Sequence, residues 1–276
     1  MTTIKSDFIK SREEFFNKIV EKFPHDKLSN LIVSHKIDET IFEKFSIEVK
    51  NFYHLSKKFN FQNMTPNGRL VPKKETDSAH NNILIYYREI LHSMGLSNEI
   101  SHYIIPVIRY KGENLNTLAL NSPTRTELAH SDYWGGWGEN TLLINIPISG
   151  DTKNNKVVYY DLPNDAGVDF MERRSSHEGE KYVNRCKKLQ LDYEVGNMYI
   201  CDISVIHGTS RAVNSKGRLS IDIPVAFKYH KTLQNNFLTS GAISAQEIQS
   251  LGKDFKLSWP SKMGQINGYE FHKITK

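Results

Sequence analysis

Two histidines and one aspartate form the clearest chemical pattern in the sequence. His130 and Asp132 are separated only by Ser131, and His207 follows much later in the chain. Two neutral imidazoles and one carboxylate are the facial triad that holds non-haem Fe(II) and leaves coordination positions open for substrate and oxygen. On a strand, residues i and i+2 point to the same face, so His130 and Asp132 can bind one ion together. The pattern predicts a metal site at His130, Asp132 and His207.

The His-x-Asp pair is a weak signal by itself, and its surroundings strengthen it. The chain has 11 histidines, and His130 alone is followed two residues later by Asp or Glu. His207 comes shortly after 198–203, an apolar stretch that is typical of a strand. The ordinary interpretation of such a histidine is a strand-end side chain that hydrogen-bonds a carbonyl. The two histidines and the aspartate are therefore interpreted as one set.

Arg218 and Ser220 add a second pattern shortly after His207. Both residues open a stretch with strand character, and their spacing places them on one face of it. A guanidinium beside a hydroxyl suits a planar carboxylate that is bound bidentately. An arginine at the start of a strand is ordinarily a solvated edge charge, but its place after the histidines favours an anion-binding role.

Other polar and aromatic residues near these motifs are weaker candidates. Asn145 lies in an apolar stretch, where a buried amide needs a hydrogen-bond partner, and we assign it to the cofactor. Four further residues are candidates for substrate contact: Arg109 on an earlier strand, Arg125 just before the first motif, and Trp134 and Trp137 in the glycine-rich segment just after it.

The elements that must position these residues change character along the chain. Residues 1–95 have helical patterning, with a capping-box pattern at Ser11 and Glu14, a cap at Asp38 and a helix from about Ser78 that stops at Gly95. This region is expected to be a helical scaffold.

The rest of the chain favours short strands. The expected strands are 103–110, 141–148, 157–160, 197–203 and 219–227. Helices followed by many strands favour a mainly β fold, a sandwich or barrel with helices packed outside it. We expect a core over 100–230, a polar insertion or lid over about 163–190, and an extension over 231–276 with a short helix at 244–251.

Composition limits the number of domains and the kinds of partner that the chain can have. A chain of 276 residues fits one domain, and a net charge of +5 with interleaved signs resembles no nucleic-acid-binding stripe. Only two cysteines occur, which indicates free thiols. The first residues lack a signal-peptide pattern, and no apolar run reaches the ~18 residues of a membrane span. The protein is expected to be soluble and cytoplasmic, without a membrane or nucleic-acid partner, and its oligomeric state is not indicated.

The ordered motifs resemble a known family. His130-x-Asp132, His207 and Arg218-x-Ser220 are similar to the signature of the Fe(II)- and 2-oxoglutarate-dependent oxygenases, and within them to the phytanoyl-CoA hydroxylase-like group. The resemblance covers roughly residues 100–230. The N-terminal helices and the C-terminal extension match no motif of that family.

The resemblance implies a fold, a cofactor and a reaction. The fold would be a double-stranded β-helix, or jelly roll, with Fe(II) near its mouth. His130, Asp132 and His207 would be the ligands, and Arg218 with Ser220 would bind the distal carboxylate of 2-oxoglutarate. Oxygen would be the second co-substrate and succinate a product. Related halogenases lack the carboxylate ligand, so Asp132 favours hydroxylation, desaturation or ring closure.

Two other functions remain open on the sequence. One is a non-catalytic β-barrel binding module, which the full set of four residues disfavours. The other is a cupin-type metal enzyme that does not use 2-oxoglutarate, although such enzymes commonly begin their motif with His-x-His, which is missing here. For the leading hypothesis, the polar insertion and spare arginines favour a small polar or anionic substrate.

Overall fold

The computed structural model describes residues 5–104, 106–113, 127–135 and 137–228, and three short strands beyond them. Four α-helices lie in the described part of the chain: α1 (Asp7–Val20), α2 (Glu39–Lys58), α3 (Asp77–Ser93) and α5 (Glu180–Val183). Three 3-10 turns accompany them: η1 (Lys74–Thr76), η2 (Asp132–Gly135) and η3 (Val168–Met171).

The strands form two antiparallel sheets and one short pair. The main sheet holds β1 (Asp26–Lys27), β2 (Ile32–Lys36), β3 (Arg69–Leu70), β4 (Ile100–Ile104), β5 (Val107–Lys111), β6 (Thr141–Gly150), β9 (Asn197–Asp202), β11 (Arg218–Phe227) and β12 (Ala242–Ser244). The smaller sheet holds β7 (Asn155–Asp161), β8 (Lys187–Lys188) and β10 (Ile206–Arg211). The pair is β13 (Leu257–Ser258) with β14 (His272–Lys273).

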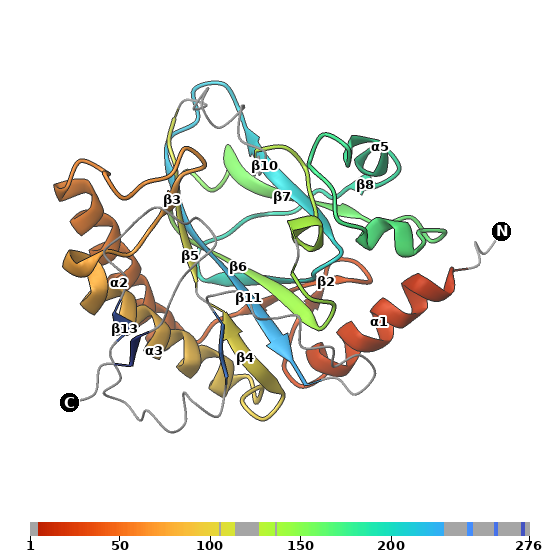
Figure 1. The fold of residues 1–276 in the computed structure, drawn as a ribbon, viewed down its shortest axis with the longest axis horizontal. Helices are drawn as coiled ribbons and strands as arrows, with labels where there is room; N and C mark the ends of the chain where they lie inside the picture. The colour runs from red at the N-terminus through yellow and green to blue at the C-terminus, as the bar shows by residue number, and fades with distance from the viewer. Residues whose placement is uncertain are drawn as a thin grey trace.

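Strand β11 is the centre of the main sheet. It pairs with β6 along its whole length, and on its other edge with β5 and then β4. The smaller sheet, with β10 beside β7, lies over this sheet (Figure 1). Residues of both sheets line one cavity between them. The expected jelly roll is confirmed, with α2 and α3 packed together outside the main sheet (Figure 1).

Apolar side chains join the helices and sheets into one core. A single buried cluster runs from Ile9 in α1 to Phe227 in β11. Almost all of β6 is buried, because it lies in mid-sheet with both faces covered. The first region also contributes strands, since β2 pairs with β9 and so extends the main sheet. Helical periodicity alone gave no sign of this strand.

The helix boundaries confirm two of the expected caps and correct a third. Asp38 caps α2, with the Ile41 N–H donating to Oδ1 at 3.0 Å. Gly95 follows α3 at φ +74, a conformation that glycine adopts without a Cβ clash. The capping box at Ser11 and Glu14 is wrong, because α1 begins at Asp7 and is capped by the Ser6 hydroxyl.

Several expected strands and segments have different limits. The strand expected over 103–110 is two strands, β4 and β5, which are separated around Pro106. Proline has no backbone N–H to donate to a neighbouring strand. The segment expected as a polar lid, 163–190, contributes Phe170 and Tyr182 to the core. Ser244 ends strand β12, and the rest of the helix expected at 244–251 lies outside the described residues.

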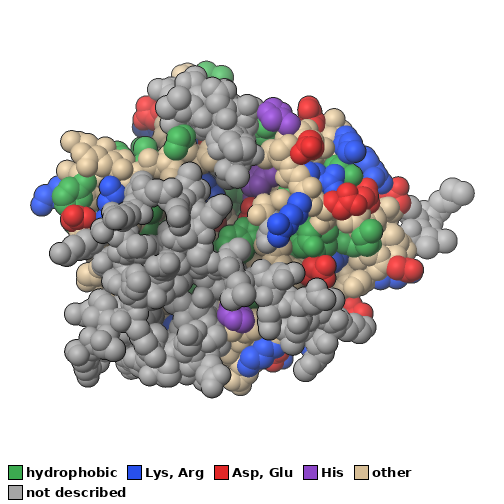
Figure 2. Space-filling model, viewed as in Figure 1, with side chains coloured by type: hydrophobic (Ala, Val, Ile, Leu, Met, Phe, Trp, Pro, Cys, Tyr) green, Lys and Arg blue, Asp and Glu red, His purple; other side chains and the backbone are tan. Residues whose placement is uncertain are grey.

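Charge and cysteine patterns agree with the expectations. Where described side chains are visible in Figure 2, Lys and Arg lie among Asp and Glu and form no stripe of one sign. Cys186 and Cys201 are free thiols. Among the described residues, no helix combines the length and the apolar character of a membrane span. A cytoplasmic location stays a prediction.

Candidate metal centre

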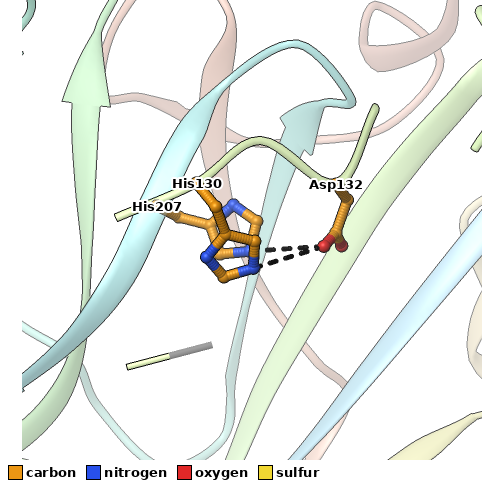
Figure 3. Close-up of side chains that lie close together, drawn as sticks. All are labelled: His130, Asp132 and His207. Atoms are coloured by element: carbon orange, nitrogen blue, oxygen red, sulfur yellow. Dashed lines mark ion pairs between the residues drawn. The ribbon is translucent and has the colours of Figure 1, made fainter. Parts of the chain in front are cut away.

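The two histidines and the aspartate meet at one point. One ligand atom from each of His130, Asp132 and His207 can be chosen so that all lie within 4.8 Å of one another. The distance to Asp132 Oδ1 is 3.5 Å from His130 Nε2 and 3.9 Å from His207 Nε2 (Figure 3). The two imidazole rings lie side by side, with centroids 4.6 Å apart. This donor set fits Fe(II) with open coordination positions.

Backbone pairing brings the distant histidine to the first motif. His130 and His207 form an isolated antiparallel bridge, and each backbone N–H donates to the other's carbonyl at 2.8 Å. His207 is the second residue of β10, whereas Asp132 opens the turn η2. The expectation that His130 and Asp132 share one face of a strand is therefore wrong. The 3-10 turn, and not a strand pleat, places the carboxylate beside the imidazoles.

Hydrogen bonds orient both imidazoles for metal binding. His130 Nδ1 lies 2.8 Å from the Leu128 carbonyl, and His207 Nδ1 lies 3.3 Å from the Val205 carbonyl. A carbonyl only accepts, so each Nδ1 carries a proton, and each ring directs its Nε2 toward Asp132, where a neutral ring offers a lone pair to a metal. Burial lowers the pKa of His207, which favours the neutral ligand form.

Asp132 is held in its ionised form. Burial acts to raise the pKa of this carboxyl, but the hydrogen bond from His130 and the nearby charges of His207, His130 and Arg109 outweigh it. The resulting pKa is about 2. An anionic carboxylate oxygen therefore faces the two imidazole rings at neutral pH.

The triad lies in a cavity that also contains three cations. Arg218 is 1% exposed and Lys111 is 2% exposed, and both line it together with Arg109. The other lining residues are Leu143 and Asn145 from β6, Val157 and Tyr159 from β7, Gly208 and Thr209 from β10, and Asp222 from β11.

Arg218 and Lys111 are paired across neighbouring strands. They lie opposite one another in the register of β11 and β5, an arrangement that repulsion disfavours unless an anion compensates it. Lys111 has such a partner in Glu127, at 2.6 Å. Arg218 forms no ion pair with another described residue; Nη1 donates to the Asn155 carbonyl at 3.3 Å, and Nε has no described partner. Among the described residues, Arg218 is thus a buried cation without an anionic partner.

Burial changes the titration of Lys111. It lowers the pKa of this ammonium, and the neighbouring charge of Arg109 acts in the same direction, whereas Glu127 acts to raise it. The resulting pKa is about 8. Lys111 is therefore mainly a cation at neutral pH and loses its charge in mildly alkaline solution.

A hydrogen-bonded network closes the main-sheet side of the cavity. The Asp222 carboxylate accepts from Arg109 Nε on one oxygen and from the Asn145 amide on the other. The Asn145 carbonyl in turn accepts from the Tyr193 hydroxyl. Asn145, which the sequence assigned to the cofactor, is thus hydrogen-bonded to two residues of the protein, and a contact with a cofactor stays a prediction. Ser220 lies between Arg218 and Asp222 on the same strand and is fully buried.

The other substrate candidates lie elsewhere or outside the described residues. Trp134 is buried against 163–190, where its indole N–H donates to the Phe170 carbonyl at 2.8 Å. Trp137 packs on the core and does not line the described cavity. Arg125 falls outside the described residues. Substrate contact by these three residues stays a prediction.

Two charged residues of the cavity were missed in the sequence. Asp222 continues the alternation of Arg218 and Ser220, so strand periodicity alone could have found it. Lys111 ends the strand that carries Arg109, but its partnership with Arg218 depends on cross-strand register. No local pattern encodes that register.

Comparisons with known proteins give loose structural similarity only. No family model matches the sequence, and no curated protein matches it. The non-heme alpha ketoglutarate dependent carbocyclase SnoK from nogalamycin biosynthesis is 14% identical, with a TM-score of 0.47 over 83% of this chain and 89% of that chain. AviO1 from Streptomyces viridochromogenes Tue57 is 12% identical, with a TM-score of 0.47 over 76% and 94%. EctD from S. alaskensis, solved with 2-oxoglutarate and 5-hydroxyectoine, is 11% identical, with a TM-score of 0.44 over 71% of each chain.

Proposed function

We propose that this protein is an Fe(II)- and 2-oxoglutarate-dependent oxygenase that acts on a small polar metabolite. The observation that carries the proposal is one cavity that joins His130, Asp132 and His207 to the buried cation Arg218. A metal triad alone fits many metalloproteins. A triad beside a buried arginine that has no anionic partner in the described part of the chain fits a metal enzyme whose co-substrate carries a carboxylate.

The protein's residues have distinct roles in this proposal. His130, Asp132 and His207 hold Fe(II) and leave three of six coordination positions open. When bound, the iron and 2-oxoglutarate supply oxidising power from O2 as the keto acid loses carbon dioxide and becomes succinate. The residues around the metal bind and orient the two organic molecules and keep bulk water away from them.

The cations of the cavity suit a dianionic co-substrate. Arg218 and Lys111 lie opposite each other, and both are positioned for the distal carboxylate of 2-oxoglutarate, with Ser220 as a further hydrogen-bond donor. Lining cations outnumber lining carboxylates by three to two, and a divalent metal adds two further positive charges. An anion that chelates the metal and reaches Arg218 compensates this excess.

The retained carboxylate ligand narrows the reaction. Asp132 occupies the coordination position that a halide needs in a halogenase of this type. Its low pKa keeps it an anionic ligand at neutral pH. The proposed outcome is therefore hydroxylation, desaturation or ring closure. In a cupin-type enzyme that does not use 2-oxoglutarate, Arg218 would need another anion as its partner.

The formation of succinate from 2-oxoglutarate can be measured without knowing the substrate, so it tests the proposal directly. Purified protein is incubated with Fe(II), 2-oxoglutarate and oxygen, alone and with a panel of small polar metabolites. The wild type is expected to form succinate, and His130→Ala none. Arg218→Met is expected to need far more 2-oxoglutarate while it still binds metal. No succinate from the wild type under any of these conditions would contradict the proposal.

A further inference from the structure

A buried ion pair lies behind the metal centre. Arg12 on α1 donates to both carboxylate oxygens of Asp202, from Nε at 3.1 Å and from Nη2 at 2.5 Å. Arg12 is 7% exposed and Asp202 is fully buried. Nη2 also donates to the Glu139 carbonyl at 2.7 Å, just before β6 begins. One guanidinium thus joins the first helix to two segments of the sheet.

Asp202 shapes the turn that leads to His207. Its Oδ1 accepts from the Ser204 N–H at 3.0 Å and from the Ser204 hydroxyl at 2.5 Å. Its backbone carbonyl accepts from the Val205 N–H at 3.0 Å. Val205 in turn provides the carbonyl that orients the His207 ring. The Asp202 carboxylate therefore orders the turn whose next residue, Val205, holds the His207 ring.

The same turn also supports the other two ligands. The Ser131 hydroxyl donates to the Ile203 carbonyl at 2.8 Å, and both groups are buried. Ser131 stands between His130 and Asp132 in the chain. The turn at 202–205 is thus the common support of all three ligands, although they come from segments far apart in the sequence.

We propose that Arg12 and Asp202 are positioning residues that set the affinity of the metal centre. The inference depends on the proposed function only in requiring that the triad binds a metal. A buried ion pair carries a desolvation cost, so two apolar side chains at these positions would hold α1 on the sheet equally well. What an apolar pair lacks is a carboxylate that orders the turn. Groups behind metal ligands commonly change metal affinity about 10- to 100-fold when they are substituted.

The test is a Co(II) titration of the full chain, read by the visible d–d absorption and by a thermal melt of the same samples. Arg12→Lys keeps the charge but loses the fork that reaches Asp202 and the Glu139 carbonyl together. Asp202→Asn keeps the size and loses the anion. Both variants are expected to bind Co(II) about 10- to 100-fold more weakly, with an altered spectrum.

Ile19→Ala is the matched control. Ile19 also lies on α1 and is 1% exposed, but it makes no hydrogen bond to Asp202. This variant is expected to melt at a lower temperature while its Co(II) affinity and spectrum match the wild type. Ser204→Ala is a milder variant that keeps the ion pair. It is expected to weaken Co(II) binding several-fold, and it decides the question if the charge variants do not fold.

The outcomes separate this inference from the proposed function. Unchanged Co(II) affinity in Arg12→Lys, Asp202→Asn and Ser204→Ala overturns the inference alone. Affinity that falls in step with melting temperature in every variant, Ile19→Ala included, overturns it too, since the role would then be structural. A wild type that binds no Co(II) contradicts both the inference and the proposed metal site.

Discussion

Two buried cations, Lys111 and Arg218, lie opposite each other beside the metal triad. Of these two, only Lys111 has a carboxylate partner among the described residues, and that partner is Glu127. At the scale of single residues, this excess of positive charge is what distinguishes the cavity from a simple metal site. It also includes Lys111, whose pKa burial lowers to about 8.

Replacement of Lys111 tests the co-substrate half of the cavity. Lys111→Met removes one charge-assisted hydrogen bond, worth roughly 1.5–3 kcal/mol, so 2-oxoglutarate should bind about 10- to 100-fold more weakly. Anaerobic titration with 2-oxoglutarate in the presence of Fe(II) measures this. Lys22→Met, which removes an exposed ion pair with Glu99, is the control and should change nothing. Equal affinities in all three proteins would rule out a role for Lys111.

The pH dependence of 2-oxoglutarate binding follows from the pKa of Lys111, which burial lowers to about 8. The ammonium attracts an anion below this pH, and the neutral amine above it does not. The affinity of the wild type should therefore fall as the pH rises through about 8. In Lys111→Met this decrease should be absent. A decrease of the same size in both proteins would assign the titration to another group.

The sequence revealed the residues whose chemistry is visible in their type and spacing. His130, Asp132 and His207 meet as predicted, and Arg218 lies in the same cavity. Lys111 was not predicted, because its role depends on which residue lies opposite it on a neighbouring strand. That partnership is a property of sheet register and cannot be read from a single segment.

At the scale of elements, the segment 163–190 packs against η2, the turn that begins with Asp132. Gly179 lies against the indole of Trp134, and a Cβ there would lie 2.0 Å from that ring. Arg174 packs over the ring of Tyr182 at 3.9 Å on the same side. Trp134 belongs to η2, the turn that begins with the ligand Asp132. The packing of this segment is therefore coupled to the position of one metal ligand.

Gly179→Ala tests that coupling. The added methyl must displace Trp134, which should lower the free energy of unfolding by about 1–3 kcal/mol and weaken metal binding. Urea denaturation and Co(II) titration measure the two effects. Gly135→Ala is the control within η2, because a Cβ there meets no atom within 4 Å. Normal metal affinity in Gly179→Ala would show that the segment and the ligand move independently.

The segment 163–190 packs into the core more than its composition indicates, and its role as an insertion or lid stays a prediction. Its charged residues dominate the composition, whereas its few apolar side chains, among them Phe170 and Tyr182, decide how it packs. The caps at Asp38 and Gly95 were predicted correctly because each depends on the residue itself and its close neighbours in the chain. At Ser11 the same local pattern was wrong, since Ser6 caps the helix and α1 already begins at Asp7.

At the scale of the whole molecule, the metal centre joins both sheets and the first helix. His207 comes from the smaller sheet, the cavity is completed by β5, β6 and β11, and Arg12 links α1 to the turn behind the ligands. In the sequence, helical patterning first and strand patterning afterwards predicted this class of fold. The place of β2 at the far side of β9 was not predictable, because a short strand pairs according to the global sheet.

Metal binding should therefore stabilise the whole fold. A site that exists only in the native state adds about 2.7 kcal/mol to the free energy of unfolding at a metal concentration 100 times Kd. For a chain of this size that corresponds to a rise in Tm of roughly 5 °C. Thermal melts with and without Co(II) measure the change. His207→Ala should lose most of the rise, and an equal rise in both proteins would place the ion elsewhere.

The central claim is that one cavity holds Fe(II) and 2-oxoglutarate together. The most direct measurement is the visible charge-transfer band that forms when 2-oxoglutarate chelates protein-bound Fe(II) without oxygen. The wild type should develop this band only when both are added, and His207→Ala should not develop it. Arg218→Met should develop it only at far higher 2-oxoglutarate concentrations. A wild type that binds Fe(II) but forms no band with 2-oxoglutarate would contradict the claim.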